Sequence, residues 1–147
     1  MQPATCGRGK VLQRKIFTWP VRVYYEDTDT GGVVYYANYL KFMERARTEW
    51  LRAQGFEQDE LLREHGVIFV VRHVVVDYFK PAAFNDELEV TVEPAESGRS
   101  QITFMQSVRR GAAVLVGARV KVACVNPESF KPVKMPDAMI KALGKEP

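Results

Sequence analysis

The sequence predicts one α+β domain in which an antiparallel sheet of five strands curves around a single long helix. The length of 147 residues suits one domain with a core of its own. Within it, one stretch carries apolar residues at helical spacing, and five stretches are rich in β-branched and aromatic residues, as strands are. The connections between the last four of these stretches are short, which favours antiparallel pairing.

The first strand and the helix follow one another early in the chain. A strand is expected at residues 17–25, where β-branched and aromatic residues dominate. A helix is expected from Asn38, with Gly55 as its C-terminal stop. Its apolar face consists of Tyr39, Leu40, Phe42, Met43, Ala46, Trp50 and Leu51. So wide an apolar arc favours a sheet that wraps the helix over a flat sheet packed on one side of it.

The remaining strands occupy the second half of the chain. A short second helix or turn is expected after the long helix, ending at Gly66. Four strands are then expected at residues 67–80, 86–96, 99–109 and 113–125. Each of the last three has an apolar face that is expected to line the core. These faces consist of Leu88, Val90 and Val92, of Ile102, Phe104 and Val108, and of Val114, Val116, Ala118, Val120, Val122 and Cys124.

The ends of the chain differ in charge from its body. The domain is expected to span residues 16–130, whereas residues 1–15 and 131–147 are basic and are expected to be loosely ordered tails. Basic tails can bind nucleic acid, but the net charge is only +3 and the body between the tails is mildly acidic. Nucleic-acid binding is therefore the least favoured function, and no nucleic-acid partner is expected.

Cysteine usage and hydropathy indicate the compartment. The two cysteines, Cys6 and Cys124, make no disulfide framework, and Cys124 is expected to pack in the core. No apolar run approaches the roughly 18 residues needed to span a bilayer, and the N-terminal residues lack the apolar core of a signal peptide. We therefore expect a soluble cytoplasmic protein without a membrane span.

The stretch "YYEDTDTGGVVYYANYLKFMERARTEWL" places acids in an unusual position. Asp27 and Asp29 follow the first strand and precede Gly31, Gly32 and the long helix. Unpaired backbone N–H groups and the positive end of the helix dipole would point toward this turn, where they favour an anion or a developing oxyanion. Asp and Thr are also common turn and capping residues. The local pattern alone therefore favours a structural role for these acids over a catalytic one.

A longer run bears on this choice through its resemblance to a family. The run "RVYYEDTDTGGVVYYANYLKFMERARTEWLR" resembles the signature of the hotdog-fold acyl-CoA thioesterases of the 4-hydroxybenzoyl-CoA thioesterase type, and the nearest branch is the tol-pal-associated bacterial thioesterases. The segments "FVVRHVVVDYFKPAAFND" and "VKVACVNPESFKPVKMP" resemble the same branch. The resemblance implies a hotdog fold, in which a five-stranded antiparallel sheet wraps the long helix. It also implies a homo-oligomer, a dimer or tetramer, with active sites between subunits.

The same resemblance implies roles for individual residues. Asp29 matches the catalytic carboxylate of the family, and the backbone N–H near Tyr36 matches the donor that polarises the thioester carbonyl. Between them, the substrate-binding positions are Gly32, Val33 and Val34. Many members of the nearest branch carry His where Tyr36 stands, and a phenol is a poor base at neutral pH. Substrate preference or rate is therefore expected to differ from those members.

Other candidate residues lie outside this run. Arg99 and Ser100, in the turn before the fourth strand, fall where the resembling enzymes contact the CoA nucleotide, so they are expected to bind substrate. His65 and His73 lack ligand spacing with Cys or with each other, so no metal is expected. The chain has no Gly-x-Gly-x-x-Gly run, no Walker loop and no Gly-x-Ser-x-Gly elbow. No cofactor is expected.

Residues and resemblance together predict an acyl-CoA thioesterase. It would hydrolyse short- or medium-chain, or aromatic, acyl-CoA thioesters to the free acid and CoA, with acyl carrier protein as a second candidate partner. A thiolate leaves readily, so a carboxylate and an oxyanion site suffice, and Asp29 could either attack the carbonyl or deprotonate water. The alternative function is a non-catalytic acyl-binding or cell-envelope-complex interaction module. A thioester hydrolysis assay separates the two.

Overall fold

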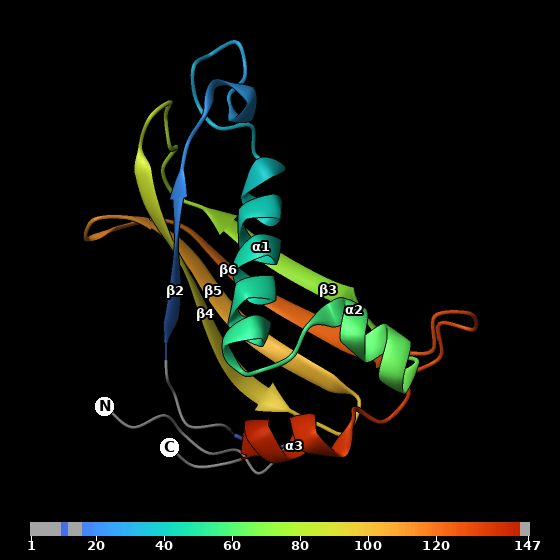
Figure 1. Ribbon diagram of the computed structural model, residues 1–147. Coiled ribbons are helices and arrows are strands. Elements are labelled where there is room, and N and C mark those ends of the chain that lie inside the picture. The colour runs from blue at the N-terminus through green and yellow to red at the C-terminus, as the bar shows by residue number, and fades with distance from the viewer. Residues whose placement is uncertain (1–9, 12–15, 145–147) are drawn as a thin grey trace.

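The computed structural model describes residues 10–11 and 16–144, in which one antiparallel sheet curves around α1 (Asn38–Ala53) (Figure 1). The strands are β1 (Lys10–Val11), β2 (Phe17–Arg22), β3 (Ile68–Tyr78), β4 (Glu87–Ser97), β5 (Gln101–Arg110) and β6 (Ala113–Val125). Their order is β1-β4-β5-β6-β3, and β2 also pairs with β4. Because β1 and β2 pair with successive stretches of β4 on the edge away from β5, the sheet is five strands wide. The predicted five-stranded sheet around one long helix is confirmed.

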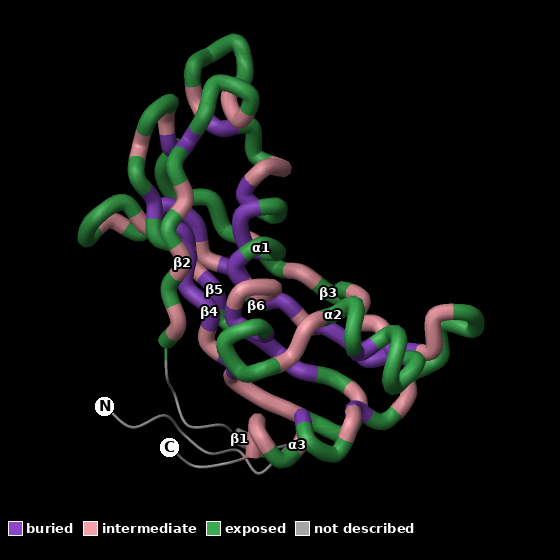
Figure 2. The backbone as a smooth tube through the Cα atoms, viewed as in Figure 1, coloured by how far each residue is buried: buried purple, intermediate pink, exposed green. Residues whose placement is uncertain are grey.

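The long helix α1 lies on the concave face of the sheet and packs over β2, β4 and β5. Of its expected apolar face, only Leu40 is exposed. Opposite the helix, the inward-facing residues of β4 and β5 are buried as predicted. These are Leu88, Val90, Val92, Ile102, Phe104 and Val108. Figure 2 shows the buried segments of α1 and of the sheet facing one another, so the core lies between them.

The first strand is shorter than predicted. β2 ends at Arg22, and η1 (Tyr25–Asp27), a turn of 3-10 helix, follows before the strand reaches its expected end. The backbone N–H of Tyr24 donates to Oδ2 of Asp27 at 2.8 Å, and the N–H of Asp27 donates to the Tyr24 carbonyl at 3.0 Å. These two bonds close the turn, so the acids lie beyond the strand in a coiled segment.

Strand β6 departs from simple alternation near its start. Alternation predicts Val114 in the core, but Val114 is 39% exposed and Leu115 is fully buried. The reason is a β-bulge, because the pairing of β6 with β5 skips Leu115. From Val116 onward the predicted core face is buried, including the free thiol of Cys124.

A short second helical segment follows α1, as predicted. α2 (Gln58–Glu60) continues into η2 (Leu61–His65), one turn of π-helix, which ends at Gly66 with a φ of 66°. The chain then enters β3 at one side of the sheet. Within the described residues β3 pairs with β6 alone, so its outer edge is open.

The C-terminal end differs from the loose tail that was expected. α3 (Asp137–Gly144) packs at the end of the sheet where β4 turns into β5 (Figure 1). Met135 and Met139 are each 1% exposed, and the backbone N–H of Met135 donates to the carbonyl of Arg99 at 2.9 Å. The reason is apolar spacing typical of a helix, which outweighs the basic composition of the segment. The residues that pack on the core are Met139, Ile140 and Leu143.

The N-terminal end contributes one short strand. The backbone of β1 pairs with β4, with Lys10 opposite Ser97 and Val11 opposite Glu96. The prediction of a loosely ordered N-terminal tail otherwise falls on residues 1–9 and 12–15, which lie outside the described residues.

Candidate active site

Asp29 sits at the tip of a turn that its own backbone closes. The N–H of Gly31 donates to Oδ1 of Asp29 at 2.9 Å, and the N–H of Gly32 donates to the Asp29 carbonyl at 3.0 Å. The N–H of Asp29 donates to the carbonyl of Val33 at 2.9 Å. Gly32 has a φ of 84°, a conformation that favours glycine. The carboxylate is therefore held in place by the turn and remains exposed to solvent.

Asp27 has a different environment, although it lies only two residues away. Its carboxylate accepts the N–H of Tyr24 within η1. Its carbonyl accepts the N–H of Tyr35 at 3.0 Å and Nδ2 of Asn38 at 2.9 Å. Asp27 thus ties the 3-10 turn to the first turn of α1. The two acids therefore differ: Asp27 caps η1, whereas the carboxylate of Asp29 is exposed.

The start of α1 leaves a backbone donor available. Ala37 occupies the N-cap position, and no side chain caps the helix there. Among the hydrogen bonds of the described residues, none has the backbone N–H of Tyr36 as its donor. Unpaired N–H groups at a helix start carry the positive end of the helix dipole. This end of α1 can therefore stabilise negative charge on an oxygen atom.

A strap formed by residues 82–83 fixes the segment between the acid and the helix. The N–H of Val34 donates to the carbonyl of Ala82 at 2.8 Å, and Val33 forms a β-bridge with Ala83. The N–H of Ala82 in turn donates to the hydroxyl of Tyr39 at 3.0 Å. Burial raises the pKa of the Tyr39 phenol, so it stays protonated at neutral pH. The strap therefore couples the position of the Asp29 turn to the first turn of α1.

A groove of about 260 Å³ opens beside the helix start. Its lining consists of Val34, Tyr36, Tyr39, Tyr78, Phe79, Lys80 and Pro81. Among these residues the charged one is Lys80. The Tyr78 hydroxyl donates to the carbonyl of Tyr36 at 3.2 Å. Tyr78 and Lys80 were not predicted as site residues. The sequence signal that could have indicated them is the run "YFKP" at the end of a strand, which places aromatic and basic side chains next to a proline.

Arg99 and Ser100 lie far from this groove within one chain. The Glu87 end of β4 pairs with Arg22, next to the Asp29 segment, whereas Arg99 follows the opposite end of the strand. The 11 residues of β4 separate the two ends by roughly 30 Å at about 3.3 Å per residue. The structure therefore brings Asp29, Gly32, Val33, Val34 and Tyr36 together but does not bring Arg99 and Ser100 to them.

The two histidines lie at exposed positions on separate elements. His65 is exposed in η2, and His73 is exposed on β3. Within the described ranges, no three His, Cys, Asp or Glu side chains are grouped so that they could hold a metal ion.

Residues 23–143 match the family model described as the thioesterase-like superfamily, so the chain belongs to this superfamily. It is 50% identical to the "Acyl-CoA thioesterase YbgC" of Haemophilus influenzae over 120 residues, which are 82% of this chain and 88% of the relative. It is 45% identical to the "Acyl-CoA thioester hydrolase YbgC" of Escherichia coli over 130 residues, 88% and 96% of the two chains. A solved structure of a probable thioesterase from Bartonella henselae is similar, with a TM-score of 0.80, 35% identity, and coverage of 83% of this chain and 100% of the other. The expected family and hotdog fold are confirmed.

Proposed function

We propose that this protein hydrolyses acyl-CoA thioesters to the free acid and CoA, with Asp29 as the catalytic carboxylate. The observation that carries the proposal is the contrast between the two acids. The Asp29 carboxylate is exposed and held by its own turn, whereas Asp27 caps η1. The names of the relatives, which are acyl-CoA thioesterases and thioester hydrolases, support the same reaction.

The chemistry needs two groups that this site offers. The backbone N–H of Tyr36 at the start of α1 would donate to the thioester carbonyl oxygen, on which negative charge develops. The Asp29 carboxylate would attack the carbonyl carbon, so that the C–S bond breaks, the thiolate leaves and a mixed anhydride forms that water then hydrolyses. In the alternative route, the Asp29 carboxylate would act as a general base and take a proton from a water molecule that attacks the same carbon. Both routes give one free acid and one CoA thiol.

The groove supplies a place for the substrate around the reacting carbonyl. Gly32 and Val33 would border the thioester, and the buried Val34 forms part of the groove wall. Lys80 is a cation at this position, which suits the phosphates of CoA. The aromatic residues of the groove favour apolar acyl groups of short or medium length, or aromatic ones.

We further propose that the protein is a homo-oligomer, a dimer or a tetramer. Arg99 and Ser100 could contact the CoA nucleotide only from a second subunit, because roughly 30 Å of β4 separates them from Asp29. The open edge of β3 presents apolar side chains, with Val71 and Val75 each 47% exposed. Such an edge is a template for pairing with another chain. Static light scattering at assay concentration tests this, and an active monomer would contradict it.

The cellular setting is also a proposal. None of the described helices is long and apolar enough to cross a membrane. We place the protein in the cytoplasm, where acyl-CoA and acyl carrier protein are candidate substrates. A non-catalytic acyl-binding role, or a role in a cell-envelope complex such as the tol-pal system, is the second candidate. It is favoured only if purified protein binds acyl-CoA without releasing thiol.

The test is a panel of acyl-CoA thioesters with detection of the free thiol. Asp29→Asn should lower kcat by roughly 100-fold or more with little change in KM, as expected for a lost base or nucleophile. Asp27→Asn is the matched control, and it should cost far less turnover and show its effect in thermal unfolding because it caps η1. Light scattering and circular dichroism should show that both variants keep the fold and the oligomeric size of the unaltered protein. An Asp29→Asn enzyme with near-normal kcat would overturn the assignment.

A further inference from the structure

A second hollow lies between the C-terminal half of α1 and the sheet, and it shares no lining residue with the groove beside Tyr36. Its volume is about 120 Å³, and α1, α2, β3, β5, β6 and α3 all contribute to its walls. The deeper walls are apolar and consist of Trp50, Phe69, Ile102, Phe104, Val122 and Met139. An apolar cavity of about 150 Å³ takes up benzene, so a hydrocarbon group of that order fits this one.

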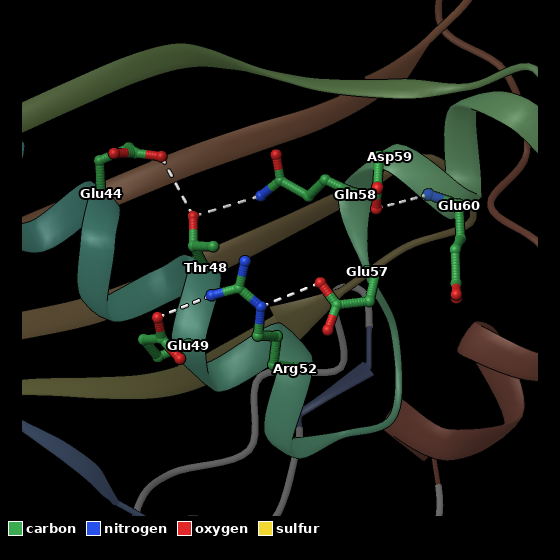
Figure 3. A network of polar contacts seen from close by, with 8 residues as sticks. All are labelled: Glu44, Thr48, Glu49, Arg52, Glu57, Gln58, Asp59 and Glu60. Carbon is green, nitrogen blue, oxygen red and sulfur yellow. Dashed lines mark hydrogen bonds and ion pairs between the residues drawn. The ribbon is translucent and has the colours of Figure 1, made fainter.

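The mouth of the cavity is polar and reaches the surface. Glu44 and Gln58 belong to its lining and are exposed. Figure 3 shows how the mouth is arranged: Oγ1 of Thr48 donates to Oε2 of Glu44 at 3.1 Å, and Nε2 of Gln58 donates to the same Thr48 oxygen at 3.4 Å. This chain of contacts joins α1 to α2 across the opening. The Glu44 carboxylate is thus held at the rim, in contact with solvent.

Polar contacts between α1 and the residue that precedes α2 stabilise the position of α2 at this mouth. Nε of Arg52 donates to Oε1 of Glu57 at 2.9 Å, and Nη1 of Arg52 donates to Oε2 of Glu49 at 2.7 Å (Figure 3). Arg52 therefore fixes the residue that precedes α2 against the last turn of α1. The cavity is a preformed feature of the junction between the two helices.

Arg47 is the cation of the cavity wall, and it is half-buried and bonded to a core residue. Its Nη1 donates to Oε1 of Gln106 at 2.9 Å, and Gln106 is only 4% exposed. Nε2 of Gln106 donates in turn to the carbonyls of Met43 and Thr91, at 3.1 and 3.2 Å. Burial lowers the pKa of Arg47, and the opposite effect of Glu44 is smaller. The guanidinium is therefore positioned by the core and has lost part of its hydration.

The remaining donors of Arg47 are available to a ligand. A guanidinium has five N–H donors, and the hydrogen bond to Gln106 uses one of them. No ion pair found among the described residues includes Arg47. No fully buried side-chain nitrogen in the described part of the chain lacks a hydrogen-bond partner, so the other nitrogens of Arg47 are not fully buried. An accessible, partly desolvated guanidinium therefore forms part of the wall of an otherwise apolar cavity.

We propose that this cavity is a binding site for small apolar carboxylates, with Arg47 as the residue that binds the carboxylate. The planar fork of Arg matches the two oxygens of a carboxylate, and partial desolvation strengthens such a charge-assisted pair. The hydrocarbon part of the ligand would fill the apolar walls. Short-chain and aromatic acids belong to this class. The free acid released by the proposed thioesterase reaction belongs to it too, but the inference does not depend on that reaction.

The test uses the full chain without any CoA compound, and it compares benzoate with benzamide, which has a similar shape and no charge. Isothermal titration should show saturable binding of benzoate and binding of benzamide that is roughly tenfold weaker or more, because the ion pair is lost. Nuclear Overhauser effects should connect the ring protons of benzoate to the methyl groups of Ile102 and Val122. Contacts to Tyr78 and Val34 instead, equal binding of the two compounds, or no saturation would overturn the proposal.

Variants of α1 provide a second comparison. Arg47→Met should weaken benzoate binding roughly tenfold or more, whereas Arg45→Met, at an exposed position on the same helix outside the cavity lining, should leave it unchanged. Glu44→Gln should strengthen benzoate binding, because it removes from the mouth a negative charge that repels the negative charge of benzoate. High salt should reduce that gain. Unchanged binding by a folded Arg47→Met protein would overturn the proposal. If that variant does not fold, the comparison of benzoate with benzamide on the unaltered protein decides.

Discussion

The hydroxyl of Tyr78, the last residue of β3, donates a hydrogen bond at 3.2 Å to the carbonyl of Tyr36, just before α1 begins. The rings of Tyr36 and Tyr78 also meet edge to face, with centroids 6.1 Å apart. Burial, and then the neighbouring Tyr36 and Tyr39, raise the pKa of Tyr78, so its phenol remains a donor at neutral pH. The end of β3 therefore fixes the peptide group that leads into the helix.

Tyr78→Phe should lower kcat for acyl-CoA hydrolysis by roughly two- to tenfold, because one net hydrogen bond contributes about 0.5–1.5 kcal/mol to holding this peptide group. KM for a short acyl-CoA should change less than kcat. Steady-state kinetics with thiol detection provide the measurement. Tyr25→Phe is the control, since Tyr25 stacks on Phe84 and lies outside the groove lining. Equal kcat values for the two variants would show that the Tyr78 hydroxyl does not support catalysis by holding the peptide group of Tyr36.

Gln106 should contribute to stability because it is a buried polar residue bonded to both layers of the fold. Gln106→Met keeps a side chain of similar length but removes the donors to the carbonyls of Met43 and Thr91. Leaving such groups unsatisfied costs about 1–3 kcal/mol, so the free energy of unfolding in urea should fall by roughly that amount. Gln101→Met, at an exposed position of the same strand, should change it little. A loss no greater than that of the control would contradict the prediction.

Cys124 should be unreactive in the folded protein. Burial raises the pKa of its thiol to about 11, so very little thiolate is present at pH 8. In a Cys6→Ser background, labelling of Cys124 by Ellman's reagent should be roughly 100-fold slower or more in buffer than in denaturant, because the thiolate is the reactive form. Rapid labelling under native conditions would show that β6 opens locally and exposes the core.

The sequence predicted those parts of the fold in which burial follows a regular period. The apolar face of α1 and the inward residues of β4 and β5 are buried as expected, except for Leu40. The shift at Leu115 was not predictable from alternation, because it depends on the pairing of β6 with β5. The turn at η1 was not predictable from alternation either, because the hydrogen bonds between Tyr24 and Asp27 end the strand there. α3 was not predicted, because the basic composition of residues 131–147 is typical of a tail even though the apolar residues of this segment have helical spacing.

The candidate site was predictable only where it is local in sequence. Asp29, the glycine turn and Tyr36 form one continuous segment, so a motif could mark them. Tyr78 meets Tyr36 across 42 positions in sequence, and Gln106 meets Met43 across 63. Contacts of that range arise from the pairing of β3 with β6 and of β5 with its neighbours. No local pattern encodes these contacts, so the partners of Tyr78 and Gln106 became visible only in the folded chain.

The ion pair between Asp86 and Arg110 should make stability depend on acidic pH. Burial alone would raise the pKa of Asp86, but the N–H of Ala83 at 2.9 Å and the guanidinium of Arg110 at 2.7 Å together hold it below 3.8, its ordinary value. A carboxyl whose pKa is lower in the folded than in the unfolded chain stabilises the fold fully above the unfolded value. That contribution is lost as the pH falls through the folded pKa. Asp86 lies just before β4 and its partner Ala83 belongs to the strap, so the effect concerns the scaffold of the site.

Asp86→Asn should therefore lower the free energy of unfolding by an amount that is constant from neutral pH down to about pH 5 and that shrinks toward pH 3 as the wild-type carboxyl takes up its proton. Urea unfolding of both proteins across this range provides the measurement. Asp77→Asn is the matched control, because Asp77 is an exposed carboxylate for which no ion pair is found among the described residues. Arg110→Met should reproduce most of the pH-dependent loss, since it removes the same charge pair from the other side. A difference between wild type and Asp86→Asn that stays constant down to pH 3, or that grows as the pH falls, would show that the hydrogen bond to Ala83 and the ion pair do not favour the charged form of Asp86.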